Sequence, residues 1–231
     1  MTLQQISDAP VQARGHRWFA AMYDPLFGAE ERRAMAPRRR RLLSDLRGDV
    51  LEIGAGTGAN FEHYSSDARV IAFEPDPFML ERAREKLDAL GRTNVDLRQA
   101  PAEELPVADA SFDAVVSTLV LCTVRDVPRA LAEMRRVLRP GGRVYFIEHV
   151  RGEGVQGRIR DLLQPIWSWF GAGCHPNRRT ERALASAGFD VEVVERGRIV
   201  PWMIPVVTGF ARPSDRQRRA HEGEAEARRP S

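Results

Sequence analysis

Leu51-Glu52-Ile53-Gly54-Ala55-Gly56-Thr57-Gly58-Ala59-Asn60 is the stretch that decides the fold of this chain. The apolar run at 49–53, which ends at Gly54, suits a buried parallel strand better than a half-exposed one. The three alternate glycines that follow allow a ligand to approach the backbone closely. Open α/β sheets bind ligands at the carboxyl ends of their strands, so this stretch predicts a binding loop after the first strand.

The spacing of these glycines and the acidic residues near them indicate the kind of ligand. A dinucleotide-binding loop has the pattern GxGxxG, whereas Gly54, Gly56 and Gly58 form GxGxG. Glu52, inside the strand, suits an ammonium such as the α-amino group of methionine better than a pyrophosphate. Glu74 ends the next predicted strand about twenty residues later, where a carboxylate can accept two hydrogen bonds from ribose hydroxyls. The alternative for Glu74 is a solvated loop carboxylate.

Strand and helix signals alternate along the chain. We expect strands at 49–53, 69–73, 95–99, 112–121, 143–150 and 191–194, and helices at 78–90, 127–138 and 179–187. Residues 139–142 are expected to form a Pro-Gly turn before the 143–150 strand, and the apolar segment 200–211 to complete the edge of the sheet. This order predicts an α/β fold, a doubly wound and mainly parallel sheet of about seven strands with helices on both faces.

One principal domain is expected, with additions at both ends. Residues 49–211 form that domain, and a segment at 152–180 rich in Gly, Trp and Pro interrupts its rhythm. Residues 1–48 are expected to form a helical lid, in which Trp18 and Tyr23 either close over the ligands or anchor the helices. Residues 212–231 contain almost no apolar side chains and are expected to be disordered.

The charge of the chain does not indicate a nucleic-acid-binding protein. The formal net charge is +3, and residues 212–231, with six arginines and four acidic residues, supply +2 of it. The run of arginines at 38–41 is short and has no interleaved aromatic residues, so we interpret it as a solvated helix face. We therefore expect no nucleic-acid partner.

The cysteines and the apolar runs predict a cytoplasmic protein without a metal site. Cys122 and Cys174 are far apart and form no CxxC motif, so neither a disulfide framework nor a zinc site is indicated. No apolar run approaches the roughly 18–20 residues that span a bilayer, and the first twenty residues lack the apolar core of a signal peptide.

Five motifs in order along the chain resemble those of class I S-adenosylmethionine-dependent methyltransferases, which have a Rossmann-like fold. They are Leu51 to Gly58, Phe73-Glu74-Pro75-Asp76, Ala102-Glu103-Glu104-Leu105-Pro106, Ser111-Phe112-Asp113-Ala114-Val115 and Val137-Leu138-Arg139-Pro140-Gly141-Gly142. A narrower resemblance, over about residues 17–211, is to the small alkyl thiol S-methyltransferase family. It rests on Gly56 to Phe61, Ala100-Pro101, Thr118 to Cys122, Glu148-His149-Val150, Pro165 with Trp167, Gly173-Cys174 with Arg178, and Pro201 to Ala211.

The resemblance implies S-adenosyl-L-methionine as the cofactor and a set of residues that would bind it. These are Glu52, Ile53, Gly54, Ala55, Gly56, Thr57, Gly58, Asn60, Glu74, Pro75, Asp76, Met79, Pro101, Ala102, Glu103, Thr118 and Leu119. Two features depart from the pattern. The animal members of the thiol family begin with a membrane-anchoring helix that this chain lacks, and Pro101 stands where many class I enzymes place an aspartate near the adenine.

Methyl transfer from a sulfonium is an in-line displacement, so we expect the enzyme mainly to align donor and acceptor and to exclude water. A thiol acceptor reacts as its thiolate, which a nearby base would favour. His149, at the end of the fifth predicted strand, is our candidate catalytic residue; the alternative is a histidine merely hydrogen-bonded in the core. Its neighbour Glu148 points to the opposite face of the strand and is expected to be structural.

The candidate residues for binding the acceptor are Trp18, Tyr23, Cys122, Trp167, Phe170 and Cys174. Direct transfer needs no enzyme nucleophile, so packing is the simpler role for both cysteines. The aromatic segment at 166–170 could line an apolar pocket, form core or touch a membrane surface.

The sequence therefore favours an S-methyltransferase for small lipophilic thiols. The alternatives are an N- or C-methyltransferase acting on a phospholipid headgroup or a quinone-like lipid, and a non-catalytic module that only binds the cofactor.

Overall fold

A computed structural model of the chain describes residues 17, 28, 31–152, 154–170, 174–199 and 204–214, except for the side chains of residues 31, 156, 163 and 165–170. The expectations for Trp18 and Tyr23 and for most of the C-terminal tail lie outside the described residues. The side chains of Trp167 and Phe170 do so as well.

A seven-stranded sheet in the order β3-β2-β1-β4-β5-β7-β6 forms the centre of the molecule. Its first five strands run parallel: β1 (Gly48–Ile53), β2 (Ala68–Phe73), β3 (Val95–Arg98), β4 (Phe112–Thr118) and β5 (Leu138–His149). β7 (Ile204–Pro213) pairs antiparallel with both β5 and β6 (Phe189–Ile199). The predicted doubly wound, mainly parallel α/β fold is confirmed.

The position of the last strand corrects the prediction that residues 200–211 form the sheet edge, because β7 lies between β5 and β6. The burial of the two strands explains the order. Val206, Val207 and Ala211 of β7 are almost completely buried, as an inner strand requires. In β6, exposed residues alternate with partly buried ones, and its charged side chains suit an edge that must not pair further.

A second correction concerns the residues 139–142, which lie within β5 and not in a turn before it. The pairing between β4 and β5 shifts its register between Phe112 and Ala114, and Gly141 has a positive φ of 85°. The proline and glycines thus produce an irregularity inside a longer strand.

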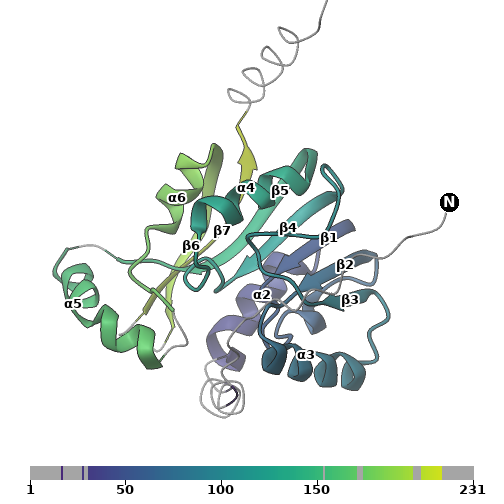
Figure 1. Cartoon of the computed structure of the whole chain (residues 1–231), viewed down its shortest axis with the longest axis horizontal. Coiled ribbons are helices and arrows are strands. Elements are labelled where there is room, and N and C mark those ends of the chain that lie inside the picture. The colour runs from purple at the N-terminus through teal and green to yellow at the C-terminus, as the bar shows by residue number, and fades with distance from the viewer. Residues whose placement is uncertain are drawn as a thin grey trace, which may run out of the picture.

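Helices cover both faces of the sheet (Figure 1), with α4 (Val127–Val137) and α6 (Thr180–Ser186) on one face and α2 (Ala36–Leu43) and α3 (Pro77–Leu90) on the other. Two apolar clusters form the two layers of the core. The first includes Leu131, Met134, Leu184, Val115 and Phe146, and the second includes Leu43, Ala83, Val50, Val70 and Val116. A short π-helix, η1 (Glu31–Met35), precedes α2, and a 3-10 helix, η2 (Phe61–His63), follows β1.

The interrupting segment at 152–180 contains a 17-residue helix, α5 (Gly154–Phe170), which the sequence rhythm did not indicate. It stands beside the sheet after β5 (Figure 1). Val155, Ile159 and Leu162 are 70%, 50% and 78% exposed. No helix in the described part of the chain combines the length and the apolar character needed to cross a membrane.

Candidate active site

The carboxyl ends of four parallel strands meet at one edge of the sheet. Ile53 of β1 pairs with Phe73 of β2 and with Ser117 of β4, and Phe73 pairs with Arg98 of β3. The loops that begin at Gly54, Glu74, Gln99 and Leu119 therefore leave the sheet side by side. These loops carry most of the residues predicted to bind the cofactor.

The glycine loop has a left-handed backbone at all three glycines, with φ values of 60° at Gly54, 57° at Gly56 and 79° at Gly58. A Cβ atom at Gly54 would lie 2.6 Å from Val120, and one at Gly58 would lie 2.5 Å from Phe61. A Cβ at Gly56 would meet no atom of the described residues within 4 Å. Gly54 and Gly58 are thus required by packing, whereas Gly56 presents an open face of the loop.

Glu74 joins the glycine loop to the start of α3. Its Oε2 accepts a hydrogen bond from the Gly56 N–H at 2.8 Å, and its Oε1 accepts one from the Asp76 N–H at 2.9 Å. Burial raises the pKa of Glu74 to about 7, although both backbone hydrogen bonds favour the carboxylate. A carboxylate has about four acceptor sites, so these two bonds leave capacity for the predicted ribose hydroxyls.

Glu52 lies beneath the loop in a buried polar network. Its two oxygens accept hydrogen bonds from the Asn60 Nδ2 at 2.8 Å and the Tyr64 hydroxyl at 2.9 Å. Asn60 and Thr118 in turn accept from the Arg39 Nη1 at 2.6 and 2.8 Å, so the network joins α2, β1 and β4. Burial raises the pKa of Glu52 to about 7. Glu52 is 1% exposed, and its contacts hold the glycine loop from below. Its direct contact with an ammonium stays a prediction.

Arg39 corrects the interpretation of residues 38–41 as a solvated face, because it is only 3% exposed. Its neighbours Arg40 and Arg41 are exposed, as expected. The helical period explains the difference, since Met35 and Leu43, four residues before and after Arg39, are both buried on the same side of the helix. That apolar spacing is the sequence signal by which Arg39 could have been found.

The other predicted cofactor residues occupy the same edge with different contacts. Asp76 caps α3 by accepting from the Phe78 and Met79 N–H groups. Glu103 accepts from the N–H groups at 125 and 126 and so supports the approach to α4. Leu119 has a left-handed backbone with a φ of 60°, so β4 ends at Thr118 and not at the predicted residue 121. The remaining residues of the set, Ile53, Ala55, Thr57, Pro75, Pro101 and Ala102, lie in or beside these loops.

Beyond Leu119 the structure brings together three residues with nitrogen or sulfur side chains. The Cys174 Sγ lies 3.7 Å from the His149 Nδ1, and the ligand atoms of Cys122, His149 and Cys174 all lie within 4.8 Å of one another. The Cys122 Sγ donates to the Leu119 carbonyl at 3.3 Å. The hydrogen bond with Cys174, together with burial, holds the pKa of the Cys122 thiol well above its usual range. Sequence spacing gave no signal for this cluster, because Cys122 follows β4, His149 ends β5 and Cys174 follows α5.

Glu148 has the structural contacts that its position predicted. It is completely buried, and its Oε1 accepts from the Ser117 hydroxyl at 2.7 Å and from the Val120 and Leu121 N–H groups at 3.1 Å each. The carboxylate therefore holds the loop that carries Cys122 against the end of β5.

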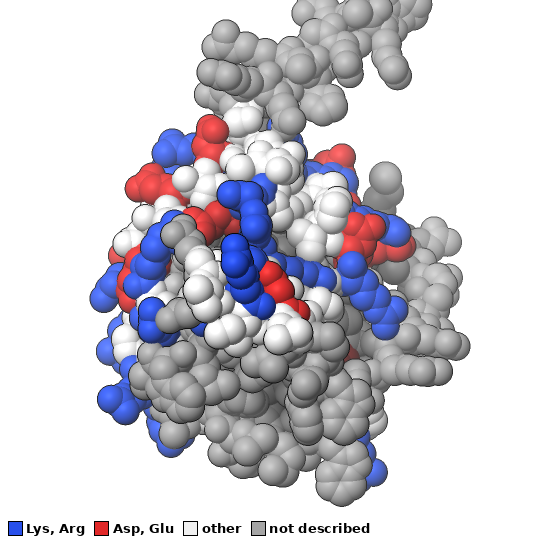
Figure 2. All heavy atoms as spheres, turned by 90° about the vertical axis from the view of Figure 1, so that its left-hand side faces the viewer, with Lys and Arg blue, Asp and Glu red and all other residues white. Residues whose placement is uncertain are grey.

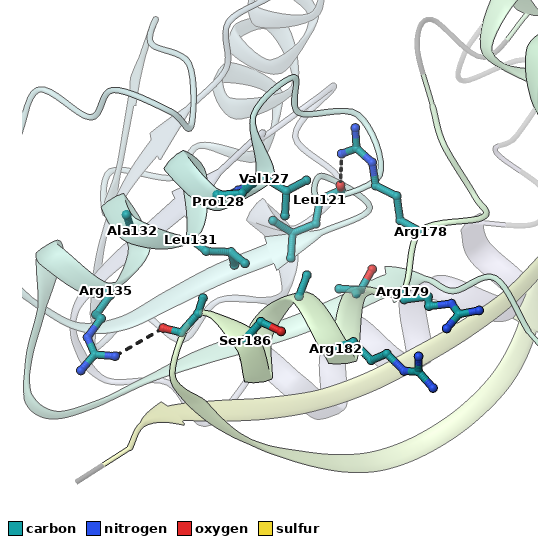
Figure 3. A pocket seen from close by; sticks show the side chains of 13 residues that line it. Leu121, Val127, Pro128, Leu131, Ala132, Arg135, Arg178, Arg179, Arg182 and Ser186 are labelled. Atoms are coloured by element: carbon teal, nitrogen blue, oxygen red, sulfur yellow. Dashed lines mark hydrogen bonds between the residues drawn. The ribbon is translucent and has the colours of Figure 1, made fainter. Parts of the chain in front are cut away.

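A groove of about 920 Å³ lies between α4 and α6 (Figure 3). Its floor is apolar, and arginines stand around it. It is lined by Leu121, Val127, Pro128, Leu131, Ala132, Ala183 and Ala187, by Arg135, Arg178, Arg179 and Arg182, and by Thr180 and Ser186. None of the predicted cofactor residues lines this groove.

Positive and negative side chains alternate on the face that carries α5, α6 and β6 (Figure 2). Ion pairs there include Arg196 with Glu181 at 2.6 Å and Arg151 with Asp161 at 2.6 Å. The arginines of this face are thus interspersed with acidic partners, and the described part of the face has mixed charge.

Comparison with known proteins agrees with this geometry. Residues 51–146 match the family model described as a methyltransferase domain. The chain is 37% identical over 177 residues to a human thiol S-methyltransferase, covering 71% of this chain and 72% of the relative. It is 35% identical over 189 residues to a phosphatidylethanolamine N-methyltransferase of Cereibacter sphaeroides, covering 80% and 89%. A solved methyltransferase structure from Thermotoga maritima is similar in fold, with a TM-score of 0.62, 24% identity and coverage of 84% and 94%.

Proposed function

Because the chain belongs to the class I S-adenosylmethionine-dependent methyltransferases, we propose that it transfers the methyl group of this cofactor to the sulfur of small lipophilic thiols. The observation that carries the proposal is the 37% identity to a thiol S-methyltransferase over 177 residues. That length reaches well beyond the 96 residues of the methyltransferase domain at 51–146, and so includes part of the chain outside the cofactor half.

The cofactor is proposed to lie along the carboxyl edge of the sheet. The open face of Gly56 would take its methionine part, and Glu74 would accept hydrogen bonds from its ribose hydroxyls. The Arg39–Asn60–Glu52 network would hold the loop in its binding geometry from below. The carboxyl groups of Glu52 and Glu74 are both buried, so water does not compete for the hydrogen bonds by which they position the loop.

The reaction needs alignment and a deprotonated acceptor. The thiolate sulfur attacks the methyl carbon in line, a carbon–sulfur bond forms, and the sulfonium bond breaks to release S-adenosylhomocysteine. We propose that His149 favours the thiolate form of the acceptor, because it ends β5 next to the loop that follows β4. Cys122 and Cys174, at 1% and 8% exposure, form the wall behind it.

A second candidate is methylation of a phospholipid headgroup. The specific observation in its favour is the apolar face of α5, where Val155, Ile159 and Leu162 are spaced at i, i+4 and i+7 and are at least half exposed. Such a face can lie in a membrane interface. The similarity to a phosphatidylethanolamine N-methyltransferase points in the same direction.

The deciding experiment measures release of S-adenosylhomocysteine from the purified full chain with alkyl thiols, aryl thiols and vesicles containing phosphatidylethanolamine. We expect turnover with thiols. Turnover with the vesicles but not with thiols would replace the first proposal by the second. Binding of the cofactor without turnover of any acceptor would indicate a non-catalytic module. Leu162→Glu, on the exposed face of α5, separates the two acceptors, since it should lower turnover of a lipid and leave a dissolved thiol unaffected.

A further inference from the structure

We propose that Cys122, His149 and Cys174 form a binding site for a thiophilic divalent cation of the Zn²⁺ class, with one coordination position left open. The three residues offer two sulfur atoms and one imidazole nitrogen, the ligand set that zinc and its softer neighbours prefer. Three protein ligands with a free fourth position are the arrangement of catalytic zinc sites, whereas structural sites have four protein ligands.

The distances in the cluster fit a tetrahedral ion. Zinc–sulfur bonds of about 2.3 Å and zinc–nitrogen bonds of about 2.0 Å place a sulfur and a nitrogen ligand roughly 3.6 Å apart, and two sulfurs roughly 3.8 Å apart. The Cys174 Sγ and the His149 Nδ1 are 3.7 Å apart. All separations in the cluster are within 4.8 Å, at most about 1 Å above the ideal, which small side-chain rotations can close.

The charge balance of the site is compatible with a cation. Cys122 and Cys174 are nearly buried and adjacent, and a cation would bind by displacing the protons of their thiols. One divalent cation neutralises both thiolates, which leaves a site with no net charge in a buried setting. The imidazole of His149 ligates in its neutral form and adds no charge.

Hydrogen bonds from neighbouring segments hold the backbone carbonyls of Cys122 and His149. The His175 N–H donates to the Cys122 carbonyl at 2.7 Å and so joins the two cysteine loops. The Thr180 hydroxyl donates to the His149 carbonyl at 3.1 Å, and Glu148 holds the loop before Cys122. Because these contacts already position the ligands, little conformational entropy is lost when the ion binds.

The open position would take the acceptor sulfur, an extension that rests on the proposed thiol methylation. Of the three residues only His149 is partly exposed, so we place the free position on its side of the cluster. The thiol would lose its proton to solvent as its sulfur bonds to the cation. The sulfur would then attack the methyl carbon of the cofactor, and the sulfonium carbon–sulfur bond would break. His149 would favour the thiolate as a ligand of the ion.

The test titrates the metal-free full chain with Co²⁺ under anaerobic conditions with a phosphine reductant, and follows the thiolate-to-cobalt charge-transfer absorbance. We expect one Co²⁺ per chain and its displacement by Zn²⁺. Cys122→Ser, Cys174→Ser and His149→Asn should each weaken binding at least about tenfold. His175→Asn is the matched control, since it removes an adjacent imidazole outside the cluster and should bind like the wild type. Circular dichroism and cofactor binding show whether each variant is folded.

A spectrum without charge transfer at saturating Co²⁺, or equal binding by folded cluster variants, would overturn the proposal. So would a thiol count showing that the metal-free protein holds a Cys122–Cys174 disulfide that persists under the reductant. An alkyl thiol added to the cobalt protein should shift the spectrum, and an unchanged spectrum would overturn the open position. These readouts need no methyl transfer, so a failure of thiol methylation and a failure of the metal site are distinguishable.

Discussion

Gly56→Ala should weaken cofactor binding without preventing folding. The glycine has a φ of 57°, and a Cβ atom there would meet no described atom within 4 Å. The substitution therefore costs only the backbone strain of a left-handed alanine, roughly 1–2 kcal/mol of the free energy of unfolding. For a chain of this size that strain lowers Tm by roughly 2–8 °C. The new methyl group projects from the face on which we propose the methionine part of the cofactor to lie.

Gly91→Ala is the matched control for this substitution. Gly91 follows α3 with a φ of 59°, and a Cβ there also meets no described atom within 4 Å. The two variants should therefore lose similar stability in thermal unfolding. Isothermal titration with S-adenosylhomocysteine should show at least about a tenfold loss of affinity for Gly56→Ala and none for Gly91→Ala. If both variants bind the ligand equally well, the glycine loop does not contact the cofactor and our placement is wrong.

Three further substitutions test the buried polar groups at this edge. Glu74→Ala should weaken S-adenosylhomocysteine binding by more than about tenfold, because it removes charge-assisted acceptors, while Glu81→Gln on the exposed side of α3 should leave calorimetric affinity unchanged. Glu52→Gln should flatten the pH dependence of stability. The pKa of Glu52 is raised to about 7, so between about pH 4.5 and pH 7 the folded state holds a proton that the unfolded state has lost. The free energy of unfolding therefore falls by roughly 3 kcal/mol as the pH rises from 4.5 to 7, and it stays constant above pH 7. Urea unfolding at pH 5 and pH 8 measures this loss, and an equal loss in the variant would contradict the assignment. Arg39→Met should lower the free energy of unfolding by about 3 kcal/mol, because it leaves the buried acceptors on Asn60 and Thr118 without their donor. Arg40→Met, at the exposed neighbouring position, should change it little. Equal unfolding midpoints of the two variants in urea would refute the network.

The fold class and the cofactor edge could be predicted from the sequence because their signals are local. Gly54, Gly56 and Gly58 adopt backbone angles that residues with a Cβ atom rarely adopt, so their spacing indicates the loop before any tertiary contact is known. Short apolar runs that alternate with helical segments indicate a parallel sheet, and Glu74 follows the second run directly. The ends of parallel strands meet at one edge, so topology alone brings these loops together.

The remaining features depend on contacts between residues far apart in the chain, which only the tertiary structure decided. β7 lies inside the sheet because its apolar residues need cover on all sides, and no spacing within 200–211 indicates this. The spacing of Met35 and Leu43 could place Arg39 on the buried side of its helix, but only the tertiary structure shows that its partners are Asn60 and Thr118. Cys122, His149 and Cys174 lie in separate segments, and the pairing of β4 with β5 and the return of the chain after α5 bring their sulfur and nitrogen atoms together.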